Sequence, residues 1–141
     1  MNAPNSDKKP FNPEDTFKII VDEHGLFNLK FFSVPNTKEA NIAQAKELDR
    51  QTRAIFKQHE PTKMPVLVDG RLISNVKYMS SEAQQIYVVL MTHPQVKRMA
   101  FVGLNKWLKL MTSAFVKLIN TWPETRWFDN MEEAHAWLEG L

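Results

Sequence analysis

Residues 65–90 read PVLVDGRLISNVKYMSSEAQQIYVVL, and the order of side-chain types along them predicts a strand, a loop and a helix. The run that ends at Asp69 is continuously apolar, which is typical of a strand buried on both faces of a sheet. Asp69 and Gly70 then open a polar connection, and Ser80 and Ser81 precede apolar residues at helical spacing. A strand that leads through a polar loop into a helix start is where open α/β sheets usually place their functional site. We therefore expect the site between Asp69 and Ser81.

The segments around this stretch alternate between strand and helix patterns. The spacing of apolar residues and the turn residues predict strands at 16–22, 26–34, 64–69, 98–103 and 125–128, and helices at 38–59, 81–92, 105–120 and from Asp129 onward. His24-Gly25 predicts a tight turn between the first two strands, which would pair as an antiparallel hairpin. The order β-β-α-β-α-β-α-β-α predicts a single α/β domain with a mixed, mostly parallel sheet covered by helices.

Two helices carry further signals. In the first, the inward face is predicted from the spacing of Ile42, Ala45, Leu48, Thr52 and Ile55. In the last, Asp129 followed by Glu132 predicts a capping box.

Size and composition are those of one soluble domain. The chain has 141 residues, 43% of them apolar, and no cysteine. It has no apolar run of the ~20 residues that span a bilayer and no signal-peptide core, so we expect a cytoplasmic location. Residues 1–15 are rich in proline and asparagine and are expected to form a mobile arm, with the domain at 16–141. The alternative is that Phe11 anchors this arm on the domain surface.

Several function classes find no support in the sequence. A net charge of +2 does not indicate a nucleic-acid partner. The four histidines are far apart, so we expect no metal site, and no nucleophile elbow, P-loop or dinucleotide loop indicates catalysis or a cofactor. We therefore expect a protein that is not an enzyme.

The predicted helix at 105–120 has more apolar surface than one packed face requires. Its simplest interpretation is a helix packed on the sheet, with lysines outside. The excess surface would also suit a homodimer or partner interface, an anionic membrane surface or an apolar ligand. The candidate residues for the ligand or the membrane are Trp107, Leu110, Met111, Phe115, Lys106 and Lys109.

Three segments together carry a family resemblance over about residues 17–140. They are PVLVDGRLISNVKYMSSEA, RMAFVG followed by a helix that contains Lys106-Trp107, and the ending TRWFDNMEEAHAWLEG. In this order the chain resembles the SpoIIAA-like branch of the STAS domains, the fold of anti-sigma-factor antagonists. This branch is also related in structure to CRAL-TRIO lipid-binding folds.

The resemblance implies a regulatory protein-interaction module. In antagonist STAS proteins, the serine of a D-S-x-G motif at a helix start is phosphorylated by a partner kinase, which switches binding to the kinase or the anti-sigma factor. In this chain Ser81 stands at the acceptor position, while Ser80 and Ala83 replace the motif's Asp and Gly.

The resemblance thus makes Ser81, with Ser80 beside it, the phosphorylation candidate. It makes Asp69, Gly70, Ser80, Ser81 and Glu82 the candidate partner-binding loop.

Two alternatives stay open. The serines are also favoured residues for an N-cap, and Asp69 has the plain interpretation of a turn carboxylate. The alternative function, which the CRAL-TRIO relationship allows, is a carrier of lipids or small apolar ligands that touches membranes.

Overall fold

The computed structural model describes residues 10–73, 76–103 and 124–140. Their helices and strands are, in chain order, β1 (Phe17–Val21), β2 (Phe27–Phe31), α1 (Lys38–His59), β3 (Met64–Asp69), α2 (Ser81–Met91), β4 (Val96–Val102), β5 (Glu124–Phe128) and α4 (Met131–Glu139). Two short 3-10 helices, η2 (Pro13–Thr16) and η3 (Arg71–Ile73), precede β1 and follow β3. The predicted helix at 105–120 lies outside the described residues.

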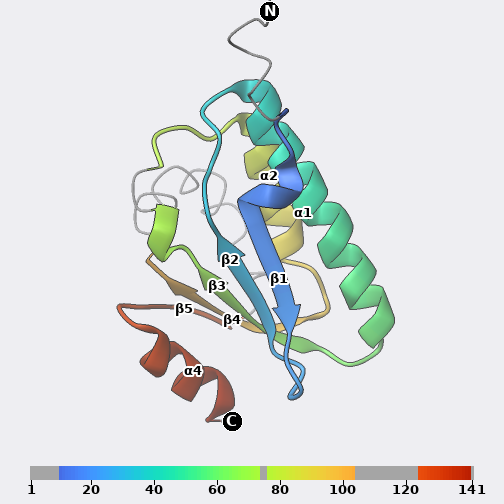
Figure 1. Cartoon of the computed structure of the whole chain (residues 1–141). Coiled ribbons are helices and arrows are strands. Elements are labelled where there is room, and N and C mark those ends of the chain that lie inside the picture. The colour runs from blue at the N-terminus through green and yellow to red at the C-terminus, as the bar shows by residue number, and fades with distance from the viewer. Residues whose placement is uncertain (1–9, 74–75, 104–123, 141) are drawn as a thin grey trace, which may run out of the picture.

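The five strands form one mixed sheet in the order β1-β2-β3-β4-β5 (Figure 1). β1 and β2 pair antiparallel, and every later neighbour pairs in parallel. This confirms the predicted α/β fold with its hairpin followed by a parallel sheet.

The hairpin turn is built by Asp22 and Gly25. The Asp22 carboxylate accepts hydrogen bonds from the N–H groups of His24 and Leu26, at 2.8 and 3.0 Å. Gly25 has a φ of 82°, a left-handed conformation that glycine adopts without strain.

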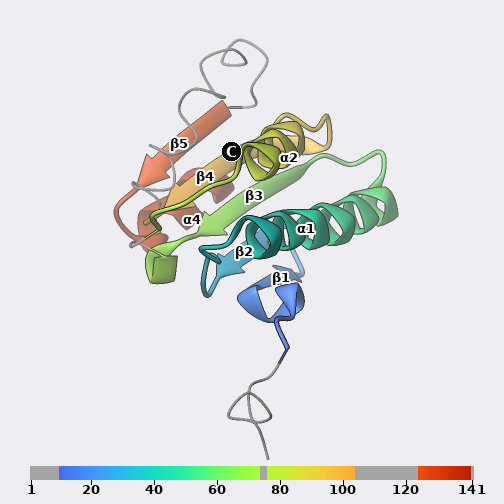
Figure 2. The same cartoon turned by 90° about the horizontal axis from the view of Figure 1, so that it is seen from above.

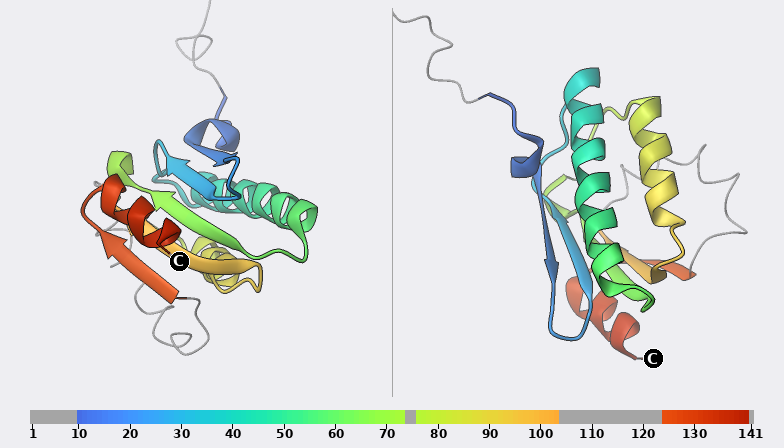
Figure 3. Two further views of the ribbon diagram at one scale, coloured as in Figure 1. Left: turned by 90° about the horizontal axis from the view of Figure 1, so that it is seen from below. Right: turned by 90° about the vertical axis from the view of Figure 1, so that its right-hand side faces the viewer.

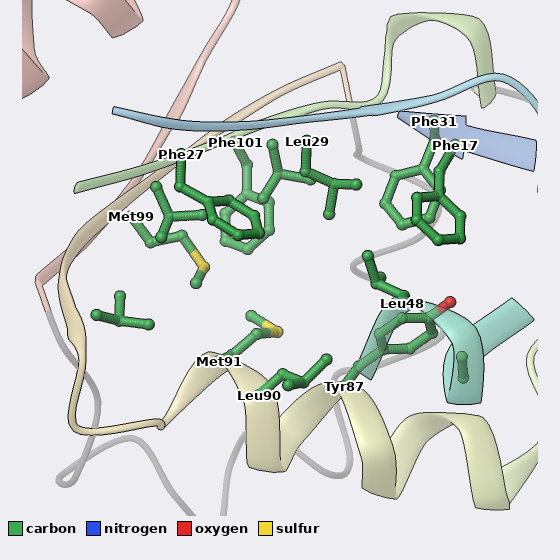
Figure 4. Close-up of a cluster of buried hydrophobic side chains, with 14 of the residues drawn as sticks. Phe17, Phe27, Leu29, Phe31, Leu48, Tyr87, Leu90, Met91, Met99 and Phe101 are labelled. Atoms are coloured by element: carbon green, nitrogen blue, oxygen red, sulfur yellow. The ribbon is translucent and has the colours of Figure 1, made fainter. Parts of the chain in front are cut away.

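Helices lie on both faces of the sheet (Figures 2 and 3). α1 and α2 cover one face, where alternate strand residues such as Phe27 and Phe101 point toward Leu48 and Tyr87 of the helices (Figure 4). α4 covers the other face with a smaller apolar cluster that includes Leu67, Ala100, Ala134 and Leu138. β3 and β4 contribute to both clusters, which explains why their sequences are continuously apolar.

Some predicted details were wrong. β4 begins at Val96, not at Arg98. The cap of α4 is Asn130, because its extended backbone lets its side-chain oxygen accept from the N–H of Glu133 at 2.9 Å. The cap predicted at Asp129 therefore lies one residue later.

The N-terminal arm was predicted to run to residue 15. Pro13–Thr16 instead form η2, capped by Asn12 and in contact with α1. Phe11 is 49% exposed.

Within the described ranges, no helix combines the length and the apolar character needed to cross a bilayer.

Candidate functional site

The predicted site lies at the carboxyl ends of the parallel strands and at the start of α2. β3 ends at Asp69, and the N–H of Gly70 donates to the carbonyl of Val102 at 2.7 Å, which ties the start of the loop to the end of β4. The chain then turns through η3 and continues to Ser80, the cap of α2 (Figure 1).

Asp69 is held by Arg71. Its carboxylate accepts two hydrogen bonds from the Arg71 guanidinium, both at 2.9 Å, and a third from the Arg71 N–H at 3.1 Å. Burial by itself would raise the pKa of the Asp69 carboxyl, but the bonds and the charge of Arg71 outweigh burial and lower this pKa. Asp69 is thus an ionised turn carboxylate, and only its partner Arg71 is substantially exposed.

The end of β4 approaches the same loop closely. Gly103 has a φ of 75°, and a Cβ at this position would lie 2.8 Å from the Cα of Arg71. Glycine is required here both by its backbone conformation and by this contact. The loop after β3 is consequently fixed at its base by Gly70, Arg71 and Gly103.

The two adjacent serines have different environments. Ser80 is 5% exposed and caps α2, because its Oγ accepts from the N–H of Ala83 at 3.1 Å. Ser81 is the first residue of α2 and is exposed, as is Glu82. The capping interpretation therefore belongs to Ser80, while the hydroxyl-bearing side chain of Ser81 is accessible.

Buried amide side chains attach this helix start to α1. Asn41 is 1% exposed; its Oδ1 accepts from the N–H of Ser80 at 2.9 Å, and its Nδ2 donates to the carbonyl of Pro35 at 3.3 Å. Gln44 donates to the carbonyl of Ser33 at 2.7 Å and accepts from the Tyr87 hydroxyl at 3.4 Å. The position of Ser81 is thus set by α1 and by the connection between β2 and α1.

The structure divides the predicted loop residues into two groups. Asp69 and Gly70 lie at the carboxyl end of the central strand β3, whereas Ser80, Ser81 and Glu82 lie at the start of α2 beside α1.

Three important residues were not predicted. Asn41, Gln44 and Arg71 carry the hydrogen bonds that hold the two groups in place. Asn41 and Gln44 fall on the apolar stripe of α1, at helical spacing from Ala45 and Leu48, and this position was a usable signal of burial. Nothing in the sequence singles out Arg71.

The predicted apolar-ligand and membrane residues Trp107, Leu110, Met111, Phe115, Lys106 and Lys109 all lie outside the described residues. Between the sheet and helices α1 and α2, the described core contains a hollow of about 50 Å³, lined almost entirely by apolar side chains. Ligand pockets are commonly about 300–1,000 Å³, so this hollow by itself is too small for a lipid chain.

No group of three or more His, Asp or Glu side chains suited to a metal ion occurs among the residues that the structure describes.

Comparison with known proteins agrees with this architecture. A family model described as SpoIIAA-like matches residues 31–139. Among solved structures, an uncharacterised protein with a SpoIIAA-like fold from Shewanella loihica PV-4 superposes with a TM-score of 0.58 at 17% identity, over 86% of this chain and 91% of the other. A search of curated proteins gave no match. The family match covers most of the domain, and the chain therefore belongs to the SpoIIAA-like family and is a STAS-type domain.

Proposed function

We propose that this chain is a non-enzymatic regulatory module that binds a protein partner around the start of α2, and that phosphorylation of Ser81 controls this binding. SpoIIAA-like domains are generally interaction modules without catalysis. The observation that most favours the proposal is the exposure of Ser81 next to a buried, capping Ser80.

The position of Ser81 suits a switch that leaves the fold intact. A phosphate adds about −1.5 to −2 charges. The N-terminus of α2 would stabilise such a charge by roughly 0.3–1 kcal/mol, while the neighbouring Glu82 would oppose it. Since Ser80 retains the cap and Asn41 retains Ser80, the added charge would change the surface and not the packing.

The test uses tagged protein expressed in its own cells. Intact-mass spectrometry should find a phosphorylated fraction, mapped to Ser81, that Ser81→Ala removes. Partner capture should differ between wild type and Ser81→Asp. Gln58→Glu is the matched control, because it adds a charge at an exposed position near the end of α1, away from the start of α2.

Two results would overturn the proposal. One is an unphosphorylated Ser81 under every growth condition. The other is a capture profile that Ser81→Asp and Gln58→Glu change to the same extent.

A further inference from the structure

A second surface lies on the face of the sheet opposite α1 and α2, beside α4. α4 contacts mainly β3, β4 and β5. On β1 and β2 this face consists of Lys18, Ile20, Asn28 and Lys30, which we call the open face. Both lysines are exposed, and Ile20 is 50% exposed.

The open face carries a local excess of positive charge. Lys18 and Lys30 stand directly opposite each other across β1 and β2. Like charges in such cross-strand positions reduce sheet stability. Neither lysine makes an ion pair within the described ranges. Asp69 is the next residue in this row and interacts electrostatically with Lys30, but its carboxylate is hydrogen-bonded to Arg71.

Apolar surface accompanies this charge. A hollow of about 230 Å³ lies between the open face and α4, and Leu67 and Met131 help to line it. Phe32 is 41% exposed, and its ring centre lies 5.9 Å from the Nζ of Lys30. The surface therefore combines two cations with accessible apolar side chains.

The dimensions of the open face fit a helix. Two strands occupy about 10 Å of sheet width, since neighbouring strands are about 4.8 Å apart. An α-helix with its side chains is about 10–12 Å across. One further helix would fit beside α4 and complete the layer on this face.

We propose that the open face binds an acidic amphipathic helix of a partner protein. Carboxylates of that helix would lie against Lys18 and Lys30, and its apolar side chains would pack on Ile20 and Met131. A second copy of this chain is a poor occupant, because a two-fold contact would bring the same lysines together. A bilayer is also a poor fit, because a flat surface does not fill the hollow beside α4. The open face is distinct from the Ser81 surface, so this inference goes beyond the proposed function.

The test is photo-crosslinking in the cells from which the chain comes. A photoreactive amino acid replaces Ile20, or Ala54 on the exposed side of α1 as a control position. Mass spectrometry then identifies the peptide joined to each site. The expected product at Ile20, and not at Ala54, is a peptide of another protein with acidic and apolar residues at helical spacing.

Charge variants make the result specific. Lys18→Glu should reduce the yield of the crosslinked product at Ile20 by about tenfold. The variant lacks Lys18, and its glutamate pairs with Lys30, so the partner loses two modest ion pairs. Lys46→Glu on α1 makes the same charge change away from the open face and should leave the yield unchanged. Lys18→Glu places a carboxylate opposite Lys30, so we expect the variant to unfold at the same or a higher temperature than the wild type. With that result, a lower crosslinking yield reflects weaker binding and not misfolding.

Four outcomes would overturn the inference: adducts only with this chain's own peptides, adducts only with lipid, a joined peptide without carboxylates, or no adduct at Ile20. Ser81→Ala serves as a separate arm. If Ser81→Ala alters partner capture while the crosslinked product at Ile20 persists, the two surfaces act independently. If Ser81 proves unmodified, the proposed function fails, and the product at Ile20 still tests the open face by itself.

Discussion

Ser80 and Ser81 show how neighbouring residues of one type acquire different roles. Both could cap a helix, since serine is among the favoured N-cap residues. The extended backbone of Ser80, with φ −67° and ψ 152°, directs its Oγ at the N–H of Ala83. Ser81, one residue later, is already in the helix and projects into solvent.

This difference predicts unequal costs of mutation. Ser80→Ala should lower the free energy of unfolding by about 1 kcal/mol, because an N–H of the first turn loses its acceptor. Ser81→Ala should change it by less than about 0.5 kcal/mol. Urea unfolding followed by circular dichroism measures both values. Equal losses in the two variants would contradict the assignment of the cap.

At Lys18 we expect a substitution to raise the free energy of unfolding, not to lower it. Lys18→Glu should raise the free energy of unfolding by about 0.2–1 kcal/mol, because an opposed like-charge pair with Lys30 becomes an ion pair. The gain should shrink in high salt, which screens exposed charges. The same urea titration with Lys46→Glu supplies the control. A loss of stability in Lys18→Glu would show that Lys18 has a stabilising role that the structure does not reveal.

At the scale of elements, the attachment of α2 to α1 depends on buried amides. Asn41→Ala would leave the N–H of Ser80 and the carbonyl of Pro35 without their partner. Leaving buried polar groups unpaired costs about 1–3 kcal/mol each, so we expect a loss of at least about 1 kcal/mol. Amide exchange should accelerate most in the first turn of α2. Gln85→Ala, on the exposed side of the same helix, is the control, and uniform acceleration along α2 would argue against a local link.

The loop after β3 has a pH dependence that follows from Asp69. The pKa of this carboxyl is lowered in the folded state, so its ionised form stabilises the fold. That contribution is complete above the ordinary aspartate pKa of about 4 and is lost as the pH falls through the lowered folded value.

Asp69→Asn should therefore be less stable than the wild type at pH 7, and the difference should close below about pH 4. Urea unfolding at several pH values between 7 and 3 measures it. A difference that stays constant over this range would mean that the charge of Asp69 does not contribute.

For the whole molecule, stability should be highest in the centre of the sheet. β3 and β4 are paired on both sides and enclosed by the two apolar clusters. Among the described residues, no strand pairs with the outer edge of β1. The N–H of Phe32 donates to the Thr16 carbonyl and the N–H of Asp22 to the Leu26 carbonyl. Because hydrogen-bonded pairs alternate along an antiparallel ladder, the N–H of Ile19 points away from β2.

Hydrogen exchange followed by NMR should reflect this arrangement. The amides of Leu67 and Ala100 should exchange only on global unfolding, and that of Ile19 should exchange many times faster. Comparable rates for Leu67 and Ile19 would contradict the arrangement.

Arg98 is a charged residue whose burial could not be predicted from the sequence. It lies in a locally basic segment of the sequence, yet it is 6% exposed beneath α4. Its guanidinium stacks 4.1 Å from the ring centre of Trp137, donates to the Trp137 carbonyl at 3.0 Å and pairs with Glu124. These partners are 26 and 39 residues away in the chain, and no local pattern could identify them.

The sequence by itself determined the local elements and the class of fold. The bounds of α1 and β3 matched the predicted ranges, because the periodicity of apolar residues records which side of a helix or strand faces the core. The family resemblance also singled out Ser81, which the structure shows to be exposed at the start of α2, and its phosphorylation stays a prediction. Only the tertiary structure decided that Ser80 is the cap, that Asn41 and Gln44 are buried, and that Lys18 and Lys30 face each other on a part of the sheet that no described helix covers. These features depend on pairings between segments distant in the chain, and periodicity within one segment carries no information about its partner.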